Sequence, residues 1–347
     1  MPDSPVLNKS DVDGALDRER RNNASCLATA DLASVPLLAA SSIRSQISQG
    51  PGVSALSAAR LPLLDSRRYP SSRAMNPNFT EPACRSDYNE YPVSAPLRRH
   101  LLCFWTQSIS GSHGRYSHRV LPDACIDIVF IDDAAPLLVG PWQESFLADF
   151  APGTKILGVR FHPGRATGLL KTPAFALLNL SAPLRDVCGQ SALAQFAGVL
   201  DQPSLPLKRA LLEGVISTWL SGCDAADSPV RGAVRWLACH PAGRIDQLCQ
   251  AMGIGPRQLH RRFLAAVGYG PKMFQSILRF QRALHLASCF PAASGLAHLA
   301  AEAGYADQSH MTREVRRFSG KPPTALLGSA RCTLGMSEFF CATDASS

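Results

Sequence analysis

Two groups of side chains in the last third of the chain could donate hydrogen bonds to the edges of DNA bases. The first group is Arg257, His260 and Arg261, and the second is Ser309, His310 and Arg313. Guanidinium, imidazole and hydroxyl groups are donors that can read bases in the major groove. Within each group the residues lie one to four positions apart, which fits one exposed face of a helix.

Apolar residues between these donors indicate which way each helix faces. Leu259 and Phe263 are four residues apart, as are Met311 and Val315, so each pair is predicted to face inward. The donors then face outward. Other side chains of the same helices suit DNA phosphates, which position a protein without reading sequence. These phosphate candidates are Arg262, Thr312, Arg316 and Arg317.

An internal repeat supplies the elements that would position the donors. IDQLCQAMGI (245–254) aligns with LAHLAAEAGY (296–305) at a constant offset of 51 residues. Each copy places a small residue in its first helix and a glycine, Gly253 or Gly304, where a left-handed turn joins two helices. The repeat predicts two helix-turn-helix units, joined by a helix from about Pro271 to Ser288.

The charge is concentrated in the same region. Residues 231–327 carry thirteen Lys or Arg and four Asp or Glu, a net charge of +9. The whole chain has +8, so the remaining residues sum to −1. A basic domain beside a near-neutral one is typical of a protein that binds a polyanion.

The middle of the chain predicts strands followed by helices. Runs rich in β-branched and aromatic residues, bounded by Pro, Gly, Asp and Ser, predict strands, and longer Ala- and Leu-rich runs after Gly164 predict helices. The predicted strands are 101–105, 117–122, 125–131, 136–140 and 155–161, and the predicted helices are 166–180, 191–200 and 207–220. In 125–131, alternation places Cys125, Asp127 and Val129 on one face of the strand, and Ile126, Ile128 and Phe130 on the other.

The predicted fold is therefore an α+β N-terminal domain joined to an all-α C-terminal domain of two helix-turn-helix units on a long helix. The first helix of the C-terminal domain is expected to begin with Ser228 as its cap and Pro229 in its first turn. The expected ranges are a disordered tail over 1–85, with Met75 as an alternative start, the α+β domain over 88–222, a linker over 222–229, the DNA-binding domain over 229–327 and a flexible tail over 328–347.

The last third resembles the AraC/XylS-type transcription regulators of bacteria. The resemblance covers residues 229–327 and includes GYGPKMFQSILRFQRALHLA (268–287) as linker helix and GYADQSHMTREVRRFSGKPP as the second-unit signature. It implies sequence-specific binding of duplex DNA through the six donors named above. Three positions depart from the family pattern: Gly255 stands where serine usually caps the first recognition helix, and Met311 and Val315 replace common aromatic residues.

The upstream domain resembles a sensor-like module that precedes this block in some members of the family. The matching segments are FW (104–105), VLPDACIDIVF (120–130), VGPW (139–142) and GVRFHPGRATGLL (158–170). Arg160, His162 and Arg165 beside glycine and proline are candidates to bind a small anionic effector, although a structural turn is the more ordinary interpretation. Trp105 and Phe161 are expected in the core.

The eleven cysteines include no CxxC pair and no zinc-ligand spacing with histidine, so no metal, cofactor or catalytic residue is predicted. Cys125 with Asp127 is a weaker alternative as a redox or metal pair. Two other functions stay open. One is a DNA-repair or thiol-dependent enzyme with a DNA-binding block, and the other is a module that binds nucleic acid without sequence specificity.

The sequence has no apolar run of about 20 residues and no basic region leading into an apolar segment at its start. A cytoplasmic protein without membrane contact is therefore expected. The candidate partners are double-stranded DNA, a small-molecule effector, RNA polymerase and a second copy of the chain.

Overall fold

The computed structural model describes residues 84–221, 227–289 and 295–327. The alternative start at Met75, the tail over 328–347, most of the tail over 1–85 and part of the linker lie outside these ranges. The first strand begins at Cys84, two residues inside the segment expected as a tail. None of the helices within these ranges has the length and apolar character needed to cross a membrane.

The N-terminal domain is built on a six-stranded antiparallel sheet in the order β1-β2-β7-β4-β5-β8, with β3 and β6 forming a separate pair. The strands are β1 (Cys84–Tyr91), β2 (Leu101–Gly111), β3 (Tyr116–Val120), β4 (Ile126–Ile131), β5 (Leu137–Val139), β6 (Phe146–Phe150), β7 (Lys155–Phe161) and β8 (Ser181–Pro183). The five predicted strands are confirmed as β2, β3, β4, β5 and β7. The sequence did not predict β1, β6 or β8.

Strand β4 is buried on both faces of the sheet. Cys125, just before the strand, and Val129 pack into one hydrophobic core, whereas Ile126, Ile128 and Phe130 pack into another. The predicted alternation is therefore confirmed. Burial on both sides explains why this segment reads as an almost continuous apolar run.

The helix predicted over 166–180 is wrong. The chain instead forms the short helix α4 (Thr167–Leu170), turns at Lys171 with a φ of 50°, and continues as the 3-10 helix η1 (Ala174–Leu177). Pro173 lies between them, and its ring lacks the amide donor that a continuous helix would need. The later helices are α5 (Leu184–Cys188), α6 (Gln190–Gln195) and α7 (Leu205–Ser221).

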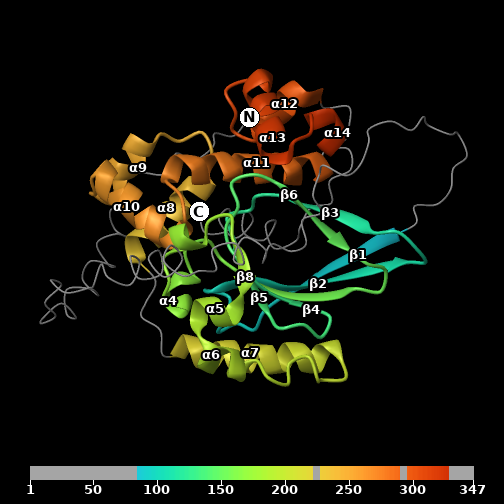
Figure 1. Cartoon of the computed structure of the whole chain (residues 1–347). Helices are drawn as coiled ribbons and strands as arrows, with labels where there is room; N and C mark the ends of the chain where they lie inside the picture. Colours follow the sequence, from blue (N-terminus) through green and yellow to red (C-terminus); the bar gives the residue numbers. More distant parts are fainter. Residues whose placement is uncertain (1–83, 222–226, 290–294, 328–347) are drawn as a thin grey trace, which may run out of the picture. The chain divides into compact units, whose positions relative to one another are not determined.

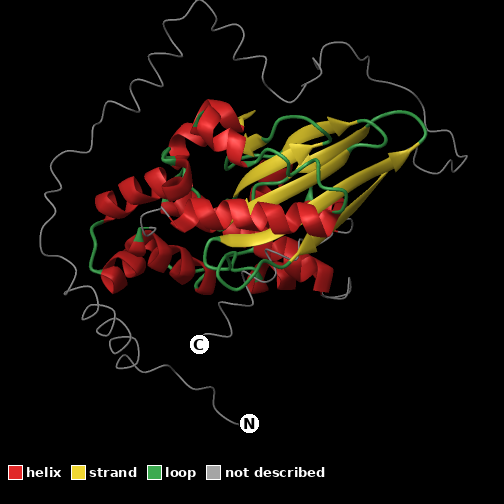
Figure 2. Cartoon of the chain, turned by 90° about the horizontal axis from the view of Figure 1, so that it is seen from below, coloured by secondary structure: helices red, strands yellow, loops and turns green. Residues whose placement is uncertain are grey.

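Helix α7 covers one face of the sheet (Figure 1), and Figure 2 shows it lying across the strands. Its residues Leu212 and Ile216 are fully buried in the core that also contains Ile128 and Phe130. Burying apolar surface stabilises the fold by about 25 cal/mol per Å². Because its apolar residues lie in this core, α7 is an integral layer of the N-terminal domain.

The C-terminal block consists of helices α8 (Ser228–Cys239), α9 (Ile245–Met252), α10 (Pro256–Val267), α11 (Pro271–Cys289), α12 (Gly295–Glu302), α13 (Gln308–Ser319) and α14 (Pro323–Leu327). The fold class predicted from the sequence is confirmed. The expected cap at Ser228 is wrong, because Asp227 caps α8 and its Oδ1 accepts a hydrogen bond from the backbone N–H of Val230 at 3.3 Å. A carboxylate one residue earlier reaches the third amide of the helix.

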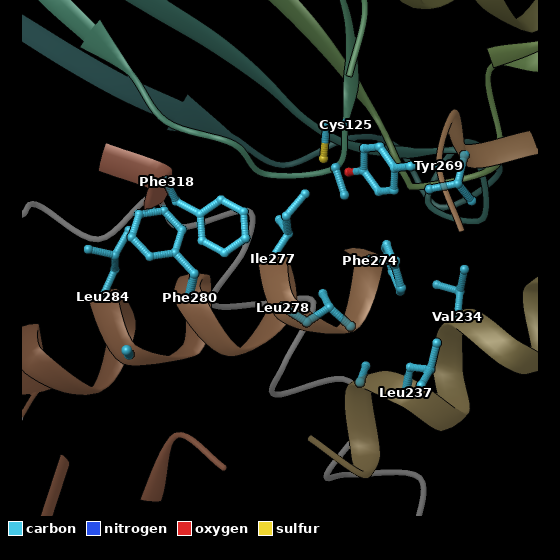
Figure 3. Close-up of a cluster of buried hydrophobic side chains, with 14 of the residues drawn as sticks. Cys125, Val234, Leu237, Tyr269, Phe274, Ile277, Leu278, Phe280, Leu284 and Phe318 are labelled. Carbon is cyan, nitrogen blue, oxygen red and sulfur yellow. The ribbon is translucent and has the colours of Figure 1, made fainter. Parts of the chain in front are cut away.

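Helix α11 lies against the second face of the sheet and is the centre of the other core. Figure 3 shows Ile277 and Phe280 near Cys125 and Phe318, and Leu278 on another side of the helix. The rings of Phe280 and Phe318 are 5.3 Å apart. One core therefore joins the sheet, the linker helix and both helix-turn-helix units.

Candidate nucleic-acid interface

The first helix-turn-helix unit is formed by α9 and α10. Gly253 ends α9 in the left-handed region with a φ of 63°, as the repeat predicted. Its amide donates to the carbonyls of Cys249 and Gln250, which lie in the last turn of the helix. The turn sets α10 against α9, with Leu259 and Phe263 fully buried between the helices and the core.

The three predicted base-reading residues of this unit, Arg257, His260 and Arg261, are all exposed on α10. Arg257 and Arg261 line an open hollow of about 330 Å³ together with Gln258. The two guanidinium groups lie one helical turn apart on the same face. Gly255 stands at the N-cap position without a side-chain cap, which leaves backbone N–H groups of the first turn open to a ligand.

The second unit is formed by α12 and α13. Gly304 takes the turn with a φ of 85°, and Met311 and Val315 are fully buried. Asp307 caps α13, because its Oδ1 accepts from the amide of His310 at 2.6 Å. Ser309 and Arg313 are exposed.

His310 and Thr312 are half-buried and already have partners within the second unit. The Nε2 atom of His310 lies 3.7 Å from a carboxylate oxygen of Glu314, and its ring meets the ring of Tyr305 edge-on. The hydroxyl of Thr312 donates to the carbonyl of Gln308 at 2.8 Å. Ser309 and Arg313 are therefore the more accessible of the three base-reading candidates on α13.

The four phosphate candidates divide into two kinds. Arg316 and Arg317 are exposed at the end of α13, where Arg317 lies 5.4 Å over the ring of Phe318. Arg262 instead forms an ion pair with Asp227, the cap of α8, at 2.7 Å. The charge of Arg262 is thus already opposed by a carboxylate that also begins the first helix of the block.

Polar side chains of α11 fix both units. The amide of Gln275 donates to the carbonyls of Pro241 and Gly243, at 3.2 and 2.7 Å, in the turn before α9. Arg279 pairs with Glu314 on α13 at 3.3 Å, and both side chains are only 12% exposed. Removing one partner of such a buried pair strongly destabilises the folded protein, because the other charge is left unpaired. The separation of the two recognition helices is therefore held by α11.

Arg160, one of the three effector candidates, lies in a buried group of acids on the sheet. Its guanidinium contacts Asp127 at 2.9 Å, Asp123 at 3.3 Å and Glu90 at 4.0 Å. Burial raises the pKa of Asp127 to about 6, against the opposing effect of Arg160. The indole N–H of Trp105 donates to Asp127 at 3.1 Å. Trp105 and Phe161 are core residues, as predicted.

The other two effector candidates lie together in the loop after β7. The backbone N–H of Arg165 donates to the carbonyl of His162 at 3.0 Å. Burial lowers the pKa of His162 to about 4, although its ring contacts the carbonyl of Arg98 at 3.0 Å. The positive charges of Arg165 and His100 also act on His162.

Burial disfavours the thiolate form of three cysteines. Burial raises the pKa of Cys103 and Cys125, and raises that of Cys188 to about 11. The thiolate is the reactive form of cysteine. Among the described residues, no three His, Cys, Asp or Glu side chains gather as they would to hold a metal ion.

Sequence reasoning missed Gln275, Gln281 and Arg231. The sequence placed both glutamines in the linker helix and predicted no contact for either. A polar residue on an otherwise apolar helix face is a signal that could have indicated a buried hydrogen bond. Arg231 was counted only as part of the basic charge. No local pattern connects it with the loop after β7, because the two segments are more than 60 residues apart.

Two family models match the chain. Residues 248–329 match a helix-turn-helix domain, and residues 89–183 match a domain of unknown function (DUF6597). No curated protein matches the chain.

The chain is also similar to solved structures. A probable AraC family transcriptional regulator from Rhodopseudomonas palustris has 25% identity, covers 30% of this chain and 99% of its own, and has a TM-score of 0.28. ToxT from Vibrio cholerae has 11% identity, with coverage of 72% and 99% and a TM-score of 0.37. A structure of ToxT bound to an unsaturated fatty acid has 12% identity, with coverage of 63% and 97% and a TM-score of 0.33.

Two helical hairpins with left-handed glycine turns, carried on one buried helix, define the C-terminal block as a double helix-turn-helix domain. With the match over 248–329, the resemblance predicted from the sequence is confirmed. The last third of the chain is therefore a helix-turn-helix domain of the kind that binds DNA.

Proposed function

We propose that this protein is a transcription regulator of the AraC/XylS type, and that it recognises a specific DNA sequence by placing α10 and α13 in the major groove. Arg257, His260 and Arg261 of α10 read one segment, and Ser309, His310 and Arg313 of α13 read another. Arg316 and Arg317 hold phosphates, with Thr312 in a secondary role. Arg262 supports the first unit through Asp227 rather than binding DNA.

The observation that carries the proposal is the division of each recognition helix into a buried and an exposed face. Leu259 and Phe263 are buried on α10, while Arg257 and Arg261, on its other face, line the same open hollow. Exposed arginines one turn apart can each form a bidentate pair with guanine. A helix that served only for packing would have no need of such an array on its solvent face.

The test begins with selection of bound genomic fragments by the purified full chain. Arg261→Ala and Arg313→Ala are then expected to relax preference at particular base pairs, with a loss of about 1–3 kcal/mol each on the selected site. Arg317→Ala is expected to weaken all duplexes similarly and to reduce the dependence of affinity on salt.

Arg185→Ala is the matched control, because Arg185 is an exposed arginine of the N-terminal domain that pairs with its neighbour Asp186 at 3.5 Å. It should leave both affinity and sequence preference unchanged. Equal, sequence-blind losses from Arg261→Ala, Arg313→Ala and Arg317→Ala would favour the non-specific nucleic-acid module instead.

We further propose that the N-terminal domain responds to an effector and that the chain acts without catalysis. The core shared by the sheet and α11 supports coupling between effector binding and DNA binding. A change in the sheet would alter the packing of α11, the helix that holds the two helix-turn-helix units. The raised pKa values of the buried thiols favour this function over a thiol-dependent enzyme.

A further inference from the structure

Five positively charged or imidazole side chains gather at the end of β7, and we call them the cationic cluster: Arg99, His100, His162, Arg165 and Arg231. They come from the turn before β2, the loop after β7 and the first turn of α8.

Backbone contacts bring these segments together. The amide of His162 donates to the carbonyl of His100 at 3.0 Å. Gly164 abuts the C-terminal block, because a Cβ built on it would lie 3.3 Å from Cγ1 of Val230. Arg165 and Arg231 directly follow these two residues in the sequence, so the loop and α8 each carry an arginine at the same junction.

Within the described part of the chain, acids do not balance the three arginines of the cationic cluster. Among the described residues, Arg99, Arg165 and Arg231 form no ion pair with a carboxylate. Burial, together with the positive charges of Arg231 and Arg99, lowers the pKa of Arg165 to about 10. Burial, Arg165, Arg99 and Arg231 also lower the pKa of His100. The groups therefore repel one another.

Two buried donors of the cationic cluster have no acceptor among the residues that the structure describes. The Nε2 atom of His100 accepts from the Nε–H of Arg99 at 3.0 Å, so a neutral His100 carries its proton on Nδ1. That Nδ1 atom and the Nε of Arg231 are both buried without a hydrogen-bond partner. A buried donor left unpaired destabilises the folded protein. A ligand group with only acceptor atoms would satisfy both.

We propose that the cationic cluster binds the oxyanion group, a carboxylate or a phosphate, of a small effector. The anion pairs with Arg165 of the N-terminal domain and Arg231 of the C-terminal block and accepts from His100. This proposal rests on the effector response proposed above and names its chemistry. The neighbourhood of Arg160 is the poorer candidate, because three acids already surround that arginine.

An anion at this point acts on the first helix-turn-helix unit. Arg231 lies on α8, whose residues Ala233 and Leu237 are fully buried in the core shared with α9 and α10. The bound anion replaces repulsion across the junction by attraction, which fixes α8 against the loop after β7. The effector therefore stabilises one arrangement of the unit.

The test measures thermal unfolding of the full chain, without DNA, in inorganic phosphate, sodium acetate or sodium chloride at matched ionic strength. Phosphate or acetate is expected to raise the Tm by about 3 °C over chloride, and the anion with the larger shift identifies the headgroup. Arg165→Gln and Arg231→Gln should each weaken the apparent anion affinity at least tenfold. In chloride they should unfold at no lower a temperature than the unaltered chain, because a like charge has been removed.

Lys155→Gln, at the opposite end of β7, is the control and should keep the full shift. No shift with either anion in the unaltered chain overturns the proposal, as does a shift that both arginine variants retain. If the variants instead weaken binding to all duplexes and no anion shift occurs, the cationic cluster holds DNA phosphate and the proposal is wrong. None of these outcomes depends on whether α10 and α13 read sequence.

Discussion

The side-chain amide of Gln281, in the middle of α11, donates a hydrogen bond to the carbonyl oxygen of Pro122 at 2.5 Å. Both residues are buried, and they are 159 positions apart in the sequence. This bond ties the linker helix of the DNA-binding block to the loop that leads into β4.

Gln281→Ala should lower the free energy of unfolding by about 1–3 kcal/mol, because it leaves the Pro122 carbonyl buried without a donor. Urea denaturation measures the loss. Gln275→Ala is the matched control, since that amide bonds only within the C-terminal block, to Pro241 and Gly243. Hydrogen exchange around Pro122 should accelerate in the first variant alone; equal acceleration in both would argue against a tie at Gln281.

The two turn glycines should differ in their tolerance of alanine. Both have positive φ, so each substitution carries a left-handed penalty of about 1–2 kcal/mol. A Cβ on Gly253 meets nothing within 4 Å, whereas one on Gly304 would lie 2.8 Å from the Cβ of Pro241. Gly304→Ala should therefore lose about 1–3 kcal/mol more than Gly253→Ala in denaturant titrations. Equal losses would mean that the second unit shifts away from Pro241 without strain.

Asp127 should make stability depend on pH. Burial raises its pKa from the ordinary 3.8 to about 6, so between these values the folded protein holds a proton that the unfolded chain does not. The contribution of Asp127 to stability therefore increases as the pH falls from about 7 to about 4. The variant Asp127→Asn lacks this contribution. As the pH falls from about 7 to about 4, the unaltered chain should therefore gain stability relative to the variant. Asp133→Asn, at an exposed position, should show no such change.

The spacing of the two recognition helices should be visible in the operator. Helix α11 has 19 residues, which span about 28 Å at 1.5 Å per residue. One turn of duplex separates neighbouring major-groove segments on one face by roughly 34 Å. Inserting about five base pairs between the two half-sites should greatly weaken binding, and inserting about ten should restore part of it. Undiminished binding to the five-pair insertion would show that only one unit reads DNA.

Patterns that repeat within a few residues were enough to predict the helix-turn-helix units. The offset of 51 residues located both glycine turns, and apolar residues four apart identified the buried faces of α10 and α13. The exposed donors then followed by elimination, because a helix with one apolar stripe must present its other residues to solvent.

The N-terminal domain was harder to predict, because its elements depend on distant partners. Strand β1 (CRSDYNEY) is polar along much of its length and is stabilised by pairing with β2. The sequence from 166 to 180 has helical composition, yet Pro173 and the turn at Lys171 divide it. Arg160 stood in a basic motif, but its acids come from β1 and from the loop and strand around β4.

The cap of α8 shows how a one-residue error arises. Asp227 and Ser228 are both good capping residues, and Pro229 fits either the first or the second position of the helix. The ion pair between Asp227 and Arg262 involves a residue 35 positions away. Local sequence therefore could not reveal the partner of Asp227.

The burial of α11 against both the sheet and the two helical hairpins restricts how the two domains of this protein can be recombined with those of others. Transplanting the N-terminal domain onto the DNA-binding half of another regulator would require a foreign linker helix to offer an amide at the position of Gln281 and apolar groups at Ile277 and Phe280. A chimera joined within residues 222–226 would separate the sheet from the helix that completes its core. The exchangeable module is the N-terminal domain together with the sheet-facing side of α11, so the two domains are expected to change in concert over evolution.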